Sequence, residues 1–123
     1  MHRFYDLTKT EEAVMDIFWE LDEPVTFKEI MDLINLKLGK EWKKQTVGTY
    51  LAKFQESGLI MANKRSMRAY LYAPACTKEE YKQMCVKRLI EEDFHNSIGE
   101  FVAAFTGGEK LSPRDAEEVK KFL

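Results

Sequence analysis

Residues 41–72 read EWKKQTVGTYLAKFQESGLIMANKRSMRAYLY, and this stretch decides the fold. Its first part predicts a helix that begins at Lys43 or Lys44 and stops at Ser57-Gly58, because glycine readily takes the left-handed backbone that ends a helix. Two short apolar runs, 59–62 and 69–72, then read as the strands of a hairpin. The polar segment between these strands carries three cations, Lys64, Arg65 and Arg68.

Two earlier helices are predicted by a shared start signal. In a capping box, a threonine hydroxyl accepts an amide of the first turn, and a glutamate three residues later reaches back to the threonine amide. Thr8 with Glu11 and Thr26 with Glu29 have this spacing, and apolar residues recur at helical spacing after each. Three helices followed by a hairpin predict a winged helix-turn-helix over residues 1–75, mainly α with a small β-hairpin wing.

The remaining part of the chain, residues 76–123, predicts helices with an uncovered apolar stripe. Apolar residues recur at three- or four-residue steps from Thr77 until Gly107-Gly108, and Ser112-Pro113 begins a last helix. Two such helices cannot bury their stripes on each other alone, so we expect a helical dimerisation domain and a homodimer. The predicted interface residues are Tyr81, Cys85, Leu89, Phe94, Ile98, Phe101, Val102, Phe105, Val119 and Phe122.

The charges of the chain are segregated along its length. The formal net charge is -2, but residues 1–36 hold three cations and nine acids, whereas residues 37–68 hold eight cations and two acids. Salt screens charges beyond about 8–10 Å, so a phosphate responds to the local charge rather than to the sum over the molecule. The basic central stretch therefore favours double-stranded DNA as a partner despite the acidic total.

The candidate DNA contacts follow from side-chain chemistry. Glutamine pairs with adenine, threonine offers a methyl group to thymine, and lysine reaches guanine or phosphate. The cations of the hairpin tip are expected to supply affinity rather than sequence reading. The predicted DNA-binding residues are Lys43, Lys44, Gln45, Thr46, Thr49, Tyr50, Lys53, Lys64, Arg65 and Arg68. The alternative is a winged helix that docks a protein partner, with cations that serve solubility; salt would weaken DNA binding steeply and protein docking much less.

Other classes of function find little support. Cys76 and Cys85 lack the short spacing of a zinc or redox site, and His2 and His95 have no ligands spaced near them, so we expect no metal. No phosphate loop or nucleophile motif is present, which argues against an enzyme and predicts no cofactor. Without a signal peptide or an apolar run of about 18 residues, the chain is expected to be cytoplasmic, with no membrane partner.

Several segments resemble the penicillinase-repressor (BlaI/MecI-type) family. They are LTKTEEAVMDIFWE, EWKKQTVGTYLAKFQESGLI, RAYLYAP and the tail from TKEEYKQM to LSPRDAEEVKKFL, and together they span nearly the whole chain. The resemblance implies a dimeric bacterial repressor that pairs through its C-terminal helices and binds two-fold-related operator half-sites. It also implies that the helix beginning at Lys43 reads the major groove, with Thr46 and Thr49 at the family's threonine positions.

The chain departs from the family pattern at several positions. Gln45 stands where lysine is common and Gly48 where a longer polar side chain is common, so we expect a different operator from those of the resistance repressors. Glu100-Phe101 replaces the Asn-Phe bond that a protease cuts in those repressors. The paired CxC motifs of the copper-responsive branch are absent from the sequence. The resemblance therefore does not indicate which signal releases the repressor.

Overall fold

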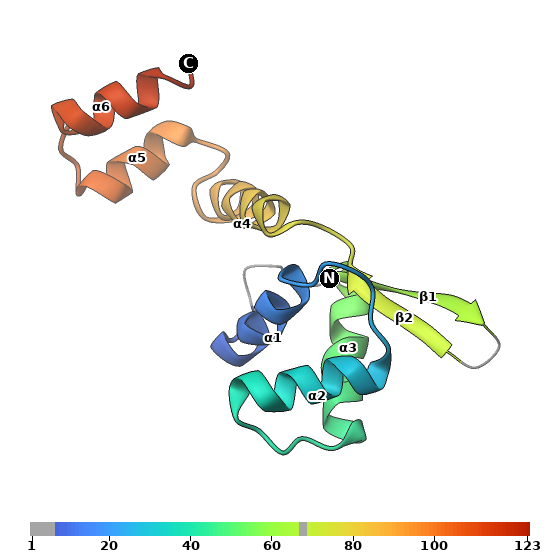
Figure 1. Cartoon of the computed structure of the whole chain (residues 1–123). Helices are drawn as coiled ribbons and strands as arrows, with labels where there is room; N and C mark the ends of the chain where they lie inside the picture. Colours follow the sequence, from blue (N-terminus) through green and yellow to red (C-terminus); the bar gives the residue numbers. More distant parts are fainter. Residues whose placement is uncertain (1–6, 67–68) are drawn as a thin grey trace. The chain divides into compact units, whose positions relative to one another are not determined.

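The computed structural model describes residues 7–66 and 69–123, with Arg65 and Ser66 described by their backbone alone. This part of the chain contains six helices and one two-stranded hairpin (Figure 1). It divides into two compact units, Met1–Cys85 and Val86–Leu123, which are described separately. The predicted fold class, a mainly α chain with a β-hairpin wing, is confirmed.

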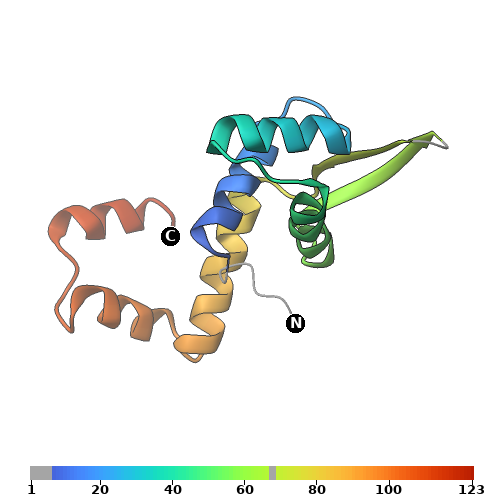
Figure 2. The same cartoon turned by 90° about the horizontal axis from the view of Figure 1, so that it is seen from below.

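The first unit begins with three helices: α1 (Lys9–Trp19), α2 (Phe27–Leu38) and α3 (Lys44–Glu56). Figure 2 shows α2 crossing over one end of α1. Both predicted capping boxes are present: the Thr8 hydroxyl accepts the Glu11 amide at 3.1 Å, and the Thr26 hydroxyl accepts the Glu29 amide at 3.2 Å. These boxes satisfy amides that the first helical turn would otherwise leave unpaired.

A glycine follows the end of α2 and the end of α3, and the one after α3 was predicted. Gly39 has a φ of 63° directly after α2, and Gly58 has a φ of 78° shortly after α3. A side chain at such a φ is strained in an L-residue, so glycine lets the chain reverse at both places. The second reversal sends the chain from α3 directly into the hairpin.

The hairpin consists of β1 (Ile60–Ser66) and β2 (Ala69–Pro74), which pair antiparallel. Its base is attached to the loop between α1 and α2: the Val25 amide donates to the Tyr72 carbonyl at 3.0 Å, and the Tyr72 amide donates back at 2.7 Å. Val25 is thus paired with the hairpin as an isolated bridge. In Figure 1 the hairpin projects away from the three helices, which is the shape of a wing.

A single apolar core holds the helices and the base of the wing together. Phe18 of α1, Ile34 of α2 and Phe54 of α3 are fully buried in it. Complete burial of such a side chain contributes about 1.5–3 kcal/mol of transfer free energy. The other fully or nearly fully buried members are Val14, Met15, Ile17, Ile30, Val47, Leu51, Leu59 and Ile60.

The turn between α2 and α3 is fixed by one asparagine. The side-chain amide of Asn35 donates to the Trp42 carbonyl at 3.0 Å, and its side-chain oxygen accepts the Trp42 amide at 2.9 Å. The Trp42 ring is half-buried and stacks on Tyr50 with 4.8 Å between ring centroids. Trp42 therefore packs under the turn and helps to define where α3 begins.

Helix α4 (Lys78–Asp93) begins inside the first unit. Tyr81 is buried in the core with its ring 5.2 Å from that of Trp19, and Lys78 forms an ion pair with Asp16 at 2.7 Å. The Trp19 indole donates to the Cys76 carbonyl at 3.0 Å. The first unit accordingly extends to Cys85, whereas the division predicted from the sequence lies at residue 75.

The second unit contains a break that the sequence analysis missed. One helix was predicted from Thr77 to Gly107, but α4 ends at Asp93 and α5 (Ile98–Thr106) begins after a reversal. His95 and Asn96 have φ values of 52° and 62° there, and asparagine accepts this left-handed conformation more readily than most residues. The Ser97 hydroxyl then accepts the Glu100 amide at 3.0 Å and starts the new helix. The prediction of one helix is wrong because the apolar spacing continues across the break.

The last helix, α6 (Pro113–Lys120), begins as predicted. The Ser112 hydroxyl accepts the Asp115 amide at 3.1 Å, and Pro113 occupies the first turn, where its missing amide proton costs nothing. Gly107 and Gly108 lie between α5 and α6 with positive φ, which confirms the predicted break at this point.

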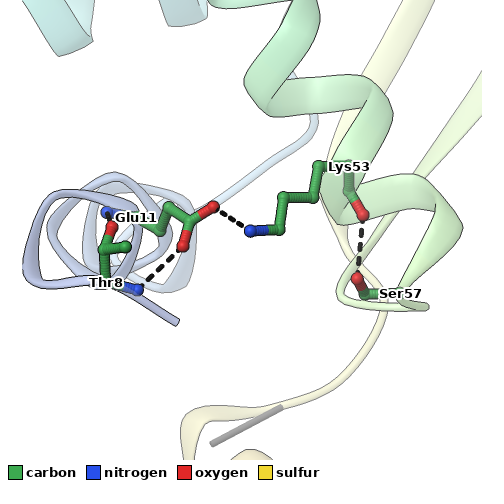
Figure 3. Close-up of polar contacts among 4 residues, drawn as sticks. All are labelled: Thr8, Glu11, Lys53 and Ser57. Atoms are coloured by element: carbon green, nitrogen blue, oxygen red, sulfur yellow. Dashed lines mark hydrogen bonds and ion pairs between the residues drawn. The ribbon is translucent and has the colours of Figure 1, made fainter. Parts of the chain in front are cut away.

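One ion pair links α1 to α3 across the first unit (Figure 3). The Lys53 ammonium group donates to one carboxylate oxygen of Glu11, while the other oxygen accepts the Thr8 amide at 2.8 Å. Glu11 is only 6% exposed, and the Lys53 side chain is 40% exposed. Because a buried carboxylate is unfavourable without a partner, the capping glutamate of α1 depends on a lysine of α3.

The protonation of Glu11 reflects these contacts. Burial acts to raise the pKa of its carboxyl group, but the hydrogen bonds from Lys53 and Thr8, with the charge of Lys53, lower the pKa below its ordinary value of 4.5. The folded chain therefore holds the charged form of Glu11 more strongly than the unfolded chain does. The resulting stabilisation is present above about pH 4.5 and is lost as the pH falls through the lowered pKa.

Replacing this carboxylate should remove one acid-sensitive part of the stability. We predict that Glu11→Gln is less stable than the wild type near neutral pH, and that the difference shrinks as the pH falls to about 3. Urea unfolding at several pH values measures the difference, with Glu12→Gln, an exposed neighbour on α1, as the control for loss of one charge. A difference that stays constant down to the lowest pH would contradict the role given to Glu11.

Candidate nucleic-acid interface

Helix α3 has one buried face and one bare face. Val47, Leu51 and Phe54 point into the core and fix the orientation of the helix. The predicted contact residues Lys43, Lys44, Gln45, Thr46 and Thr49 are all exposed and lie at the start of the helix or in its first two turns. The structure thus brings these five polar side chains together on the solvent side of a helix whose other side is anchored.

The start of α3 favours negatively charged groups. Lys43 is the N-cap residue and makes no side-chain capping bond, in contrast to the threonine caps of α1 and α2. No acidic residue lies in the first turn of α3. The amides at a helix start carry partial positive charge, which adds here to the charges of two lysines. This end of α3 is therefore suited to a phosphate group.

One hydrogen bond within α3 limits which groups of Thr49 are available to DNA. The Thr49 hydroxyl donates to the Gln45 carbonyl at 2.9 Å, so its proton is already used within the helix. Its methyl group and oxygen lone pairs remain for a thymine methyl or a donor on a base. A side chain at Gly48, on the same helix, would meet only the Phe27 ring, at 4.0 Å.

Two predicted contact residues, Tyr50 and Lys53, are engaged inside the protein. The half-buried Tyr50 ring lies flat on Trp42, and Lys53 is paired with Glu11. Both still border the bare face, because they line a hollow of about 430 Å³ with Thr8, Glu11, Thr46 and Thr49. The first turn of α1 is thereby part of the same surface, a relation that the sequence analysis did not predict.

In the wing, Lys64 is the cation whose side chain the structure describes. Lys64 is exposed on β1 and pairs in register with Tyr70 on β2, a residue that is 50% exposed. The strand register shifts between Lys64 and Ser66, which is a bulge near the tip. The side chains of Arg65 and Arg68, also predicted as contacts, lie outside the described residues.

The predicted dimer residues fall into two groups. Tyr81 is buried in the core of the first unit and Cys85 packs against it, which leaves little of either for a partner chain. The others lie in the second unit, where no side chain of α5 or α6 is buried. The exposed apolar side chains there include Ile98, Phe105, Val119 and Phe122, the last of them 89% exposed. Leu89, Phe94, Phe101 and Val102 are half-exposed, and Phe94 and Phe101 contact edge to face.

Within residues 7–66 and 69–123, no group of three or more histidine, cysteine, aspartate or glutamate side chains is arranged to hold a metal ion. Both cysteines are free thiols, and burial raises the pKa of each. None of the described helices has the length and apolar character that crossing a bilayer requires.

The solved structures that align with this chain share little sequence identity with it. The structure of hsRosR-SG, solved as a complex, aligns with a TM-score of 0.54 at 18% identity over 98% of this chain and 92% of that one. Lactococcus lactis ZitR, a zinc-responsive MarR family member, aligns with a TM-score of 0.46 at 18% identity over 96% and 72% of the two chains. ZitR in complex with DNA aligns with a TM-score of 0.46 at 18% identity over 95% and 70%. At 18% identity, the likeness to hsRosR-SG concerns the fold alone.

The sequence comparisons give the family. The search of curated proteins returned no significant match. The sequence profile of the penicillinase repressor matches residues 7–123, which include both units and every described residue of the candidate interface. Such repressors regulate transcription and are not enzymes. The chain belongs to the penicillinase repressor family.

Proposed function

We propose that this protein is a transcriptional repressor that binds a pseudo-palindromic operator as a homodimer, with α3 in the major groove and the wing on the backbone. The observation that carries the proposal is the start of α3: it is uncapped, free of acids and lined by exposed Lys43, Lys44, Gln45 and Thr46, while its other face is fixed in the core. Family membership supports the same function.

Each group at this interface has a separate task. Gln45, Thr46 and Thr49 carry the groups that distinguish base edges in the major groove. Lys43 and Lys44, with the cations of the wing, bind phosphates and hold the helix in register without reading sequence. Arg65 and Arg68 belong to this second group by their place in the sequence. Specificity would therefore depend on three short polar side chains and most of the affinity on cations.

Dimerisation supplies the second half-site. The apolar side chains of α5 and α6 lack cover within their own unit, so a second copy of the chain is the partner that would bury them. One winged helix binds its half-site weakly, whereas joining two raises the effective concentration of the second at its site. The bound dimer would occupy a promoter in the cytoplasm and block polymerase.

The proposal is tested first by DNA binding itself. Fluorescence anisotropy with a duplex from the promoter of the protein's own gene should show tight binding that weakens steeply with salt, by a log–log slope of about 0.9 for each phosphate contact. A scrambled duplex of the same composition should bind much more weakly. Equal binding to both duplexes, or binding indifferent to salt, would count against an operator-binding repressor and favour protein docking.

The homodimer is tested by placing a charge on the uncovered face. Phe105 is 70% exposed, so Phe105→Asp should leave its own unit folded and yet make the dimer monomeric by sedimentation, with a large loss of operator affinity. Leu36→Asp, at a 79% exposed apolar position on α2, is the matched control and should remain dimeric. A Phe105→Asp protein that is still dimeric and still binds tightly would refute this interface.

A further inference from the structure

The candidate reading face of α3 continues into a stripe that meets α1. Thr46, Thr49 and Lys53 follow one another at steps of three and four residues, so they lie on one side of the helix. All three line the hollow of about 430 Å³ that Thr8 and Glu11 close from the side of α1. A buried carboxylate, Glu11, thus lies beside the surface that is proposed to approach DNA.

That carboxylate would oppose DNA if it were uncompensated. A negative charge near the phosphates raises the energy of the complex, and the effect is larger where protein excludes water. The Lys53 ammonium group lies against Glu11 and supplies the compensating charge, as Figure 3 shows, and Thr8 satisfies the other oxygen. Lys53 is therefore already committed to a partner before DNA arrives.

We infer that Lys53 is the counter-ion of Glu11 rather than a phosphate contact, and that Glu11 acts as a specificity residue by withholding this lysine from DNA. The inference rests on the proposed DNA-binding function and refines it, since it removes one cation from the predicted contacts. The Lys53 side chain is 40% exposed at the edge of the reading face. Once released from Glu11, it would bind a backbone phosphate whatever the DNA sequence. Its pairing keeps sequence-independent attraction low near Thr46 and Thr49.

The two possible roles of Lys53 predict different salt dependences. If Lys53 stays paired with Glu11 when DNA binds, removing both charges leaves the number of phosphate contacts unchanged. Removing the Glu11 charge alone then adds one phosphate contact. If Lys53 leaves Glu11 for a phosphate, removing both charges loses one contact, and removing Glu11 alone adds none. Each contact changes the slope of log affinity against log salt by about 0.9 on B-form DNA.

Two variants separate these cases. Glu11→Gln removes the charge but keeps a side-chain oxygen for the Thr8 amide, because glutamine also completes a capping box. Glu11→Gln with Lys53→Met removes the whole pair and keeps the length of the lysine stem. Operator and scrambled duplexes are titrated across several salt concentrations, after thermal unfolding has shown that each variant is folded.

The expected result for Glu11→Gln is a slope steeper than that of the wild type by about 0.9 and a several-fold gain on the scrambled duplex. Its preference for the operator falls accordingly. The double variant should return to the wild-type slope. A Glu11→Gln slope equal to that of the wild type would overturn the inference, and so would a double variant whose slope is shallower by about 0.9.

Two further variants and the wild-type protein show why an unexpected salt dependence arises. Glu12→Gln removes a charge from the same turn of α1 at an exposed position and should leave the slope near that of the wild type; a gain as large as that of Glu11→Gln would assign the effect to general charge and overturn the inference. Lys44→Met, at the exposed start of α3, should lower the slope by about 0.9. A wild-type protein without salt-dependent binding would instead refute the proposed function, and the inference with it.

Discussion

Burial of one face of α3 is the constraint on which the rest of the structure depends. Val47, Leu51 and Phe54 take that face into the core, so the helix cannot rotate to hide its polar residues. Asn35 fixes the turn before α3, and Glu11 holds the helix from the side of α1. The position of every exposed side chain at the start of α3 follows from these contacts, which is the pre-organisation that base reading requires.

Local signals made most of the first unit predictable from the sequence. Capping boxes at Thr8 and Thr26 and the glycine after α3 are decided by neighbours within a few residues, and the structure confirms them. The break near Asn96 was missed because apolar spacing continues across it, although Asn96-Ser97 combines a residue that tolerates positive φ with a capping residue. In that case a turn signal had more influence than periodicity.

The candidate site was less predictable because part of it depends on pairing between distant residues. The exposed residues at the start of α3 could be named from side-chain chemistry and helical spacing. The link between Glu11 and Lys53 joins positions 42 residues apart, and each residue alone has an ordinary explanation as a cap or a surface cation. Only the fold shows that they share a partly buried contact, and the inferred role of Lys53 depends on that contact.

The most direct test of the central claim maps where DNA touches the protein. Backbone amide signals of the isotopically labelled protein are followed by NMR as the promoter duplex is added. The account predicts that the largest shifts occur in residues 43–49 and in the wing, with little change in α5 and α6. Large shifts in α5 and α6 with α3 unaffected would contradict the account, because DNA would then bind a surface other than the bare face of α3.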